Sequence, residues 1–159
     1  MKQILVVCTA NICRSPLVAG ELQARFAAAG LSDQVTVKSA GVYGLTGEKA
    51  SRYSVELLAA KGIDISQHIA AALTEADIYQ ADLILVMEEK HRQSLFHYSP
   101  ADFHKVLLLS ELVNQHFDLK DPYGQNKAAY MGMLATVERV LDLGWQNLLK
   151  HLKLEANAT

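Results

Sequence analysis

Two residues near the start of the chain, Cys8 and Arg14, have the types and spacing that could bind and attack a phosphate group. Five residues separate them, and Ser15 follows the arginine. A cysteine thiolate is a strong nucleophile, and an arginine guanidinium can pair with two phosphate oxygens at once. A thiolate below a bound phosphoryl group can attack phosphorus in line and form a phosphocysteine, which requires no metal or cofactor. The same spacing also fits a buried cysteine at a strand end with an unrelated arginine after it.

The segments on either side of this motif favour the phosphate interpretation. Residues 4–7 are apolar and mostly β-branched, which predicts a buried strand. Ser15 and Pro16 predict the start of a helix that has proline at its first position and that ends at Gly30. Ser15 can cap this helix, donate a hydrogen bond to the Cys8 thiolate, or do both. A loop between a strand and a helix N-terminus can turn several backbone N–H groups inward, where they bind an anion and favour a thiolate. We therefore expect the 8–15 loop, meaning residues 8–15, to bind an anion.

The rest of the chain alternates between predicted strands and helices. Further strands are expected from residues 35–37 to an end in residues 39–41, and at residues 83–87 and 106–109. Helices are expected at residues 51–62, from Thr74, and at residues 88–97 and 126–152. Such alternation predicts an α/β fold in which helices cover both faces of a parallel sheet. Ligands of these sheets bind beyond the carboxyl ends of the strands. The 8–15 loop follows the first strand and so lies at such an end.

Composition limits the classes of partner and compartment. Half of the 159 residues are hydrophobic and the formal net charge is −2, which favours neither nucleic acid nor an acidic membrane surface as a partner. The N-terminal apolar run is too short for a signal peptide, and no run reaches the roughly 18 apolar residues that span a bilayer. Cys8 and Cys13 are the only cysteines, which favours a reducing cytoplasm. We expect one domain over residues 1–154 and a tail at residues 155–159.

Several motifs follow one another along most of the chain. They are VCTANICRSP at 7–16, SAG at 39–41, GID at 62–64 with His68, LILVM at 83–87 and DPY at 121–123. Their types and order resemble those of the low-molecular-weight protein tyrosine phosphatases. The resemblance implies a three-layer α/β sandwich with a four-stranded parallel sheet, the phosphotyrosine phosphatase I-like fold. It also implies an enzyme, a phosphoric monoester hydrolase that acts on phosphotyrosine through Cys8 and Arg14.

The resemblance assigns the proton donor to Asp121, which precedes Pro122. A residue before proline favours an extended backbone, so this carboxyl group can project from a loop, protonate the departing phenolate and later activate water. Asp118 is the alternative acid, and an ordinary Asp-Pro turn is the alternative structure. The residues that the resemblance places around the substrate are Thr9, Ala10, Asn11, Ile12, Cys13, Ser15, Leu45 and Tyr123.

The resemblance also implies that Ser39 and His68 hold Asn11 in a left-handed conformation. Asparagine tolerates a positive φ better than most residues do. Ala10 stands where the family usually has glycine, so the loop must avoid conformations that only glycine adopts. We expect no metal site and assign no chemistry to the other histidines, which are His91, His97, His104, His116 and His151.

Leu45 stands where relatives often have an aromatic residue against the substrate ring, with Tyr123 as the opposite wall or as an ordinary packed tyrosine. Leu45 and the segment LILVMEEKHRQSL at 83–95 resemble the bacterial branch that is associated with capsule and exopolysaccharide loci. The implied partner is the autophosphorylated tyrosine-rich tail of a bacterial tyrosine kinase. Cys13 either pairs with Cys8 under oxidation, as in the family, or is a small buried residue.

Other functions fit parts of the same pattern. A protein arginine phosphatase shares the fold, but such relatives tend to carry threonine where this chain has Ile12. An arsenate reductase relays a disulfide through further cysteines, and none follows Cys13. A non-catalytic anion-binding module does not call for a nucleophile and an acid together. Zinc binding by Cys8 and Cys13 lacks a second pair of ligands.

Overall fold

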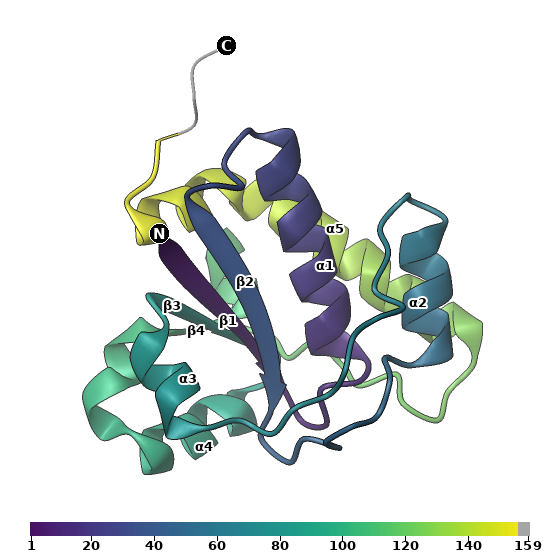
Figure 1. Cartoon of the computed structure of the whole chain (residues 1–159), viewed down its shortest axis with the longest axis horizontal. Coiled ribbons are helices and arrows are strands. Elements are labelled where there is room, and N and C mark those ends of the chain that lie inside the picture. Colours follow the sequence, from purple (N-terminus) through teal and green to yellow (C-terminus); the bar gives the residue numbers. More distant parts are fainter. Residues whose placement is uncertain (156–159) are drawn as a thin grey trace.

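The computed structural model describes residues 1–155, which form a sheet of four parallel strands with helices around it (Figure 1). The strands are β1 (Lys2–Cys8), β2 (Val35–Gly41), β3 (Leu83–Val86) and β4 (Val106–Leu108), in the spatial order β2-β1-β3-β4. Because all the pairings are parallel, the carboxyl ends of the strands meet at one edge of the sheet. Cys8, the last residue of β1, therefore lies at the middle of that edge.

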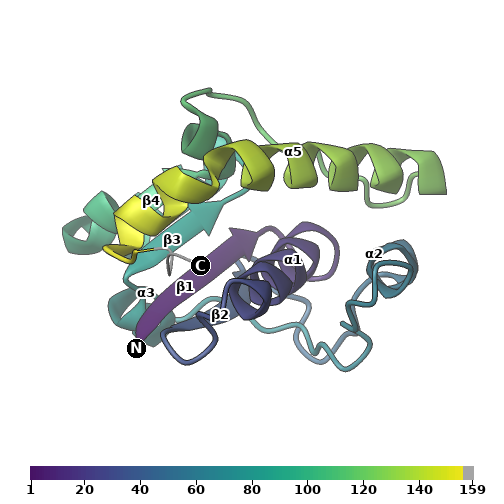
Figure 2. The same ribbon diagram turned by 90° about the horizontal axis from the view of Figure 1, so that it is seen from above.

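Helices cover both faces of the sheet (Figures 1 and 2). The helices α1 (Arg14–Ala28), α2 (Arg52–Ala59) and α5 (Lys127–Leu152) enclose one core, and α3 (Glu75–Gln80) and α4 (Glu89–Tyr98) enclose the other. Two 3₁₀ helices, η1 (Pro100–Lys105) and η2 (Leu109–Val113), flank β4 and were not predicted from the sequence. The predicted three-layer α/β architecture is confirmed.

Strand β1 is buried on both faces, which explains its continuous apolar run. Ile4 and Val6 point into the core that contains α1 and α5, whereas Leu5 and Val7 point into the core that contains α3 and α4. Successive side chains of a strand point to opposite faces, so a central strand of a covered parallel sheet has to be apolar at every position. This burial fixes the position of Cys8 relative to both layers of helices.

The boundaries of some elements differ from those predicted. β2 ends in the SAG segment at Gly41 as predicted, because this segment also pairs with the end of β1, whereas β3 ends at Val86, one residue before its predicted end. α2 ends at Ala59, and a turn then leads to Gly62, which has a positive φ of 79°. The capping box predicted at Thr74 is confirmed at the start of α3.

Helix α1 begins at Arg14, so the prediction that Ser15 caps this helix is wrong. Cys13 occupies the N-cap position and makes no side-chain capping hydrogen bond. Ser15 lies within the first turn, where its hydroxyl group faces the interior of the 8–15 loop and not a free backbone N–H group. Gly30 follows the end of the helix with a positive φ of 69°, as the predicted stop requires.

The C-terminal helix α5 follows the predicted 126–152 span, and the side chain of Asn126 caps it by accepting a hydrogen bond from Ala129 N. Of the predicted tail, only Glu155 belongs to the described part of the chain, and residues 156–159 lie outside it. Within residues 1–155, no helix is both long enough and apolar enough to cross a membrane.

Candidate active site

The 8–15 loop is shaped by a left-handed residue, Asn11, with a φ of 60°. Its side chain is fully buried, and its Nδ2 donates to Ser15 Oγ at 2.7 Å and to Ser39 Oγ at 2.9 Å. Its backbone carbonyl accepts from His68 Nε2 at 2.8 Å. Its Oδ1 accepts from Ala71 N at 3.0 Å. The structure thus brings Asn11, Ser39 and His68 together, and these contacts hold the backbone in a conformation that few other residues adopt.

The sulfur of Cys8 lies inside this loop. Cys8 Sγ is 3.0 Å from Ser15 Oγ and accepts a hydrogen bond from Asn11 N at 3.3 Å. Since Asn11 Nδ2 already donates to Ser15 Oγ, the hydroxyl hydrogen of Ser15 is free to point at the sulfur. Two donors therefore face Cys8 Sγ, which is the environment that a thiolate requires.

A pocket of about 190 Å³ opens above the sulfur. Its lining contains nine of the predicted site residues, namely Cys8, Thr9, Ala10, Ile12, Cys13, Arg14, Leu45, Asp121 and Tyr123. Of the residues predicted to surround the substrate, Asn11 and Ser15 are not in this lining; both are buried and support the loop. Their contact with substrate stays a prediction.

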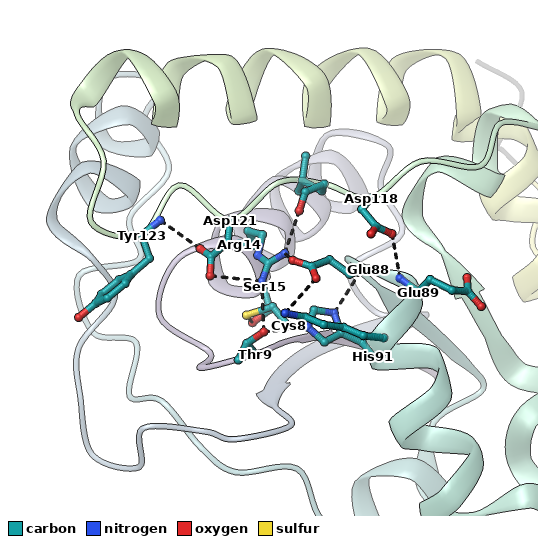
Figure 3. Close-up of polar contacts among 12 residues, drawn as sticks. Cys8, Thr9, Arg14, Ser15, Glu88, Glu89, His91, Asp118, Asp121 and Tyr123 are labelled. Carbon is teal, nitrogen blue, oxygen red and sulfur yellow. Dashed lines mark hydrogen bonds and ion pairs between the residues drawn. The ribbon is translucent and has the colours of Figure 1, made fainter.

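Arg14 is almost fully buried and joins three segments of the chain (Figure 3). Its Nη1 donates to Glu88 Oε1 and, at 2.8 Å, to the backbone carbonyl of Leu119. Its Nη2 donates to Thr9 Oγ1 at 3.3 Å and is 3.5 Å from Asp121 Oδ2. Its Nε has no hydrogen-bond acceptor within the described chain, so this N–H group is available to a phosphate oxygen.

Glu88 was not predicted from the sequence as a site residue. It lies two residues after the end of β3, its carboxylate accepts a hydrogen bond from Arg14 Nη1, and it is not among the residues that line the pocket. Burial alone would raise the pKa of Glu88, but the hydrogen bond and charge of Arg14 outweigh it and lower the pKa. Its position could have indicated this role, because Glu88 is an acidic residue at the carboxyl edge of the sheet, next to a strand that pairs with β1.

His91 was also missed, and it too lies beside the loop. It is 2% exposed in the first turn of α4, and its Nε2 is 2.9 Å from Thr9 Oγ1. Its Nδ1 accepts a hydrogen bond from Glu88 N at 3.1 Å. Burial, and next the positive charge of Arg14, lower the pKa of His91 to about 4, so this imidazole is neutral at physiological pH. The sequence around His91 held no local signal for this contact, because its partner Thr9 is 82 residues away.

The two candidate acids lie in different places. Asp121 lines the pocket with a partly exposed side chain, and its Oδ1 accepts from Tyr123 N at 3.1 Å. Asp118 lies outside the pocket lining, and its Oδ1 accepts from Glu89 N at the start of α4 at 2.9 Å (Figure 3). The geometry therefore places Asp121 within reach of a bound substrate and gives Asp118 a structural contact.

Cys13 is buried, like Cys8, and is a free thiol in this structure. Its Sγ is 3.3 Å from the hydroxyl group of Tyr130 on α5. Burial raises the pKa of Cys13, and burial together with the Cys13 contact raises the pKa of Tyr130 to about 12. Both groups are therefore neutral at physiological pH, and Cys13 is a poor nucleophile compared with a thiolate.

The segment that contains Leu45 forms one wall of the pocket, and its backbone hydrogen-bonds directly to the 8–15 loop. Tyr43 N donates to Thr9 O at 2.8 Å, and Leu45 N donates to Ala10 O at 3.1 Å. At Gly41, an added Cβ atom would lie 2.6 Å from Thr9 O, so only glycine permits this close approach. Leu45 and Tyr123 line the pocket and are both exposed, whereas the exposed Tyr43 lies outside the lining.

No group of three or more His, Cys, Asp and Glu side chains that could hold a metal ion occurs within residues 1–155. Every donor and acceptor described above belongs to the chain itself. The arrangement of nucleophile, guanidinium and carboxyl group around one small pocket is suited to the transfer of a phosphoryl group.

Comparisons with known proteins agree with this chemistry. The family model described as low molecular weight phosphotyrosine protein phosphatase matches residues 3–158. The probable low molecular weight protein-tyrosine-phosphatase EpsP of Ralstonia nicotianae is 39% identical over 142 residues, which are 89% of this chain and 92% of that protein.

Two solved structures are similar over almost the whole chain. One is the low molecular weight protein tyrosine phosphatase from T. tengcongensis, with a TM-score of 0.87, 36% identity and coverage of 92% of this chain and 99% of that one. The other is the YwlE arginine phosphatase, a cysteine-to-serine mutant with a phosphorylated active site serine. Its TM-score is 0.85 at 33% identity, and the match covers 94% of this chain and 96% of that one.

Proposed function

The chain belongs to the low molecular weight phosphotyrosine protein phosphatase family and is a protein tyrosine phosphatase, and from that premise we propose how its residues act. In this proposal Cys8 is the nucleophile, Arg14 binds the phosphate and Asp121 is the general acid. One observation carries the proposal: Cys8, Arg14 and Asp121 line the same pocket, with Ser15 Oγ 3.0 Å from Cys8 Sγ.

The first step transfers the phosphoryl group to the enzyme. Cys8 Sγ attacks phosphorus, the S–P bond forms and the bond between phosphorus and the tyrosine oxygen breaks. Arg14 Nε–H and the backbone N–H groups of the 8–15 loop stabilise the charge on the phosphoryl oxygens. Asp121 gives its proton to the departing phenolate, which leaves as neutral tyrosine.

The second step releases inorganic phosphate. Asp121, now ionised, takes a proton from a water molecule, and the water oxygen attacks the phosphocysteine. The S–P bond breaks and the thiolate of Cys8 is restored. The structure of the YwlE mutant with a phosphorylated active site serine supports a covalent intermediate of this kind on the same fold.

We infer that the substrate is the phosphorylated tyrosine-rich tail of a bacterial tyrosine kinase in polysaccharide production, in the cytoplasm. Leu45 and Tyr123 offer two apolar walls that fit an aromatic ring and leave the pocket mouth open to an extended peptide. Relatives named as protein-tyrosine-phosphatases, among them EpsP and AmsI, support phosphotyrosine as the substrate class, and the polysaccharide role rests on the resemblance of Leu45 and of residues 83–95 to the capsule and exopolysaccharide branch.

The test compares phosphate release from three substrates: a phosphotyrosine peptide panel, the phosphorylated kinase tail and a phosphoarginine peptide. The proposal predicts hydrolysis of phosphotyrosine, preference for the tail and little release from phosphoarginine. Equal rates on all tyrosine peptides would reject the kinase tail as the substrate. Faster release from phosphoarginine would instead favour the arginine phosphatase function of the YwlE relative, in spite of Ile12 in the pocket lining. Cys8→Ala is the control, and it should bind phosphate without turnover.

A further inference from the structure

His91 is a buried, titratable side chain that the proposed mechanism does not use. It is on α4, on the opposite face of the sheet from α1, yet it contacts the 8–15 loop through Thr9 Oγ1 at 2.9 Å. A buried histidine with two hydrogen bonds has a fixed orientation, and both of its partners adjoin the catalytic centre: Glu88 and Thr9 each contact Arg14. His91 is therefore connected to the phosphate-binding guanidinium of Arg14 by two routes, one through Thr9 and one through Glu88.

The hydrogen-bond partners determine which nitrogen of His91 carries the proton. Glu88 N is a backbone donor, so His91 Nδ1, at 3.1 Å, must be the acceptor. In a neutral imidazole the proton is then on Nε2. His91 Nε2 therefore donates to Thr9 Oγ1. Thr9 Oγ1 accepts this hydrogen bond and a second one from Arg14 Nη2 at 3.3 Å, so that both lone pairs of the hydroxyl oxygen are in use.

Arg14 Nη2 has two possible acceptors in the described chain, Thr9 Oγ1 at 3.3 Å and Asp121 Oδ2 at 3.5 Å. Nη2 carries two N–H groups, so the hydrogen bond to Thr9 Oγ1 holds one of them in place while the Asp121 carboxylate lies near the same nitrogen. If Thr9 Oγ1 turns away, Nη2 is free to move closer to the Asp121 carboxylate, to which it is attracted by charge. A carboxyl group in an ion pair favours its charged form. Asp121 would then be less available to give a proton to the leaving group.

We propose that His91 is a positioning residue: by donating to Thr9 Oγ1 it keeps this oxygen directed at Arg14 Nη2 and thereby limits the pairing of Arg14 with Asp121. The inference rests on the proposed roles of Arg14 and Asp121. It adds a chain of contacts that runs from α4 through Thr9 to the catalytic arginine (Figure 3). His91 acts only through Thr9 and has no contact with substrate.

Two substitutions separate the two hydrogen bonds of His91. In His91→Asn the amide oxygen can still accept from Glu88 N near the position of Nδ1, but the side chain is too short to reach Thr9. In His91→Gln the amide nitrogen can reach the position of Nε2 and donate to Thr9 Oγ1. Thr9→Val removes the acceptor with little change in shape, and Thr9→Ser restores it.

The measurement is kcat/KM for p-nitrophenyl phosphate, which has a good leaving group, and for phenyl phosphate, which has a poor one. This parameter reports the steps up to formation of the phosphocysteine, in which Asp121 gives its proton. We expect His91→Asn and Thr9→Val to lose about tenfold with phenyl phosphate and much less with p-nitrophenyl phosphate. The inhibition constant of inorganic phosphate should change little. His91→Gln should stay close to the wild type, and Thr9→Ser should recover most of what Thr9→Val loses with phenyl phosphate.

The double variant His91→Asn/Thr9→Val provides a second criterion. Because His91 acts through Thr9, the double variant should be no slower than Thr9→Val alone. Additive losses, equal losses with both leaving groups, or unchanged activity in His91→Asn would each overturn the proposal. If His91→Asn fails to fold, as thermal unfolding would show, Thr9→Val and Thr9→Ser decide the question by the same leaving-group comparison. A wild type without turnover would instead reject the proposed function itself.

Discussion

Arg14 Nη1 donates to the backbone carbonyl of Leu119 at 2.8 Å, across a separation of 105 residues. Leu119 N in turn donates to Met87 O at 2.8 Å, next to Glu88. The Arg14 guanidinium thus connects the 8–15 loop, the end of β3 and the segment that carries Asp121. A change at Arg14 should therefore affect both phosphate binding and the position of the acid.

Arg14→Lys should reduce kcat/KM for aryl phosphates by about 100-fold or more, since a lysine has one cationic nitrogen and cannot serve Glu88, Leu119 O and a phosphate oxygen together. The inhibition constant of inorganic phosphate should rise in parallel. Arg52→Lys is the matched control, because Arg52 is exposed on α2 and forms an ion pair with Glu56 one turn along the helix. Comparable losses of kcat/KM in both variants would show that the loss does not arise from the contacts of Arg14 at the pocket.

Asp121→Asn should slow reactions with poor leaving groups far more than those with good ones, by about 100-fold with phenyl phosphate. The reason is that the phenolate then leaves without a proton. Asp118→Asn is the control, since Asp118 lies outside the pocket and accepts from Glu89 N. An equal loss with every leaving group in Asp121→Asn, or a larger leaving-group effect in Asp118→Asn, would contradict the assignment of the acid.

Glu88→Gln should lower the free energy of unfolding by about 1–3 kcal/mol at pH 7, because it leaves the buried Arg14 charge without its closest counter-charge. The lowered pKa of Glu88 means that its carboxylate stabilises the fold above the unfolded pKa of about 4.5 and that this stability is lost as the pH falls through the folded pKa. Urea denaturation at pH 7 measures the difference. Glu48→Gln, at an exposed position, should change the midpoint little, and an equal change in both variants would count against the buried pair.

His91 should make the protein less stable at mildly acidic pH. Its pKa is about 4 in the folded chain against 6.5 in the unfolded chain, so the unfolded state binds more protons between these values. Stability therefore falls as the pH falls from 6.5 towards 4, by roughly 3 kcal/mol at most, since each pKa unit corresponds to about 1.4 kcal/mol. The groups that face His91 are Arg14, Glu88, Lys90 and Asp118.

The check is urea denaturation between pH 5 and pH 7, above the range in which Glu88 titrates. His91→Gln should show a smaller loss of stability on acidification than the wild type does, because its side chain does not titrate. His97→Gln is the matched control on the same helix, where the side chain is exposed and should change nothing. The same slope in the wild type and in His91→Gln would mean that His91 is readily protonated in the fold.

The sheet and the 8–15 loop could be predicted from the sequence, because the residue patterns that indicate them are contiguous in the chain. The apolar run before Cys8 and the Ser15-Pro16 pair are contiguous with the loop. Of the two roles predicted for Ser15, the structure shows the contact with the sulfur and not the helix cap. The partners that complete the site could not be found in this way. Glu88 and His91 lie 74 and 82 residues from the loop residues that they contact, and only the parallel pairing of β1 with β3 brings them together.

The central claim is that Cys8 carries the phosphoryl group, and the most direct test traps that intermediate. The enzyme is mixed with an aryl phosphate labelled with ³²P, quenched in acid within milliseconds and digested, and the labelled peptide is identified. The account predicts that the label is on the peptide that contains Cys8, and that Cys8→Ala gives neither label nor turnover. Label on another residue, or turnover by Cys8→Ala, would contradict it.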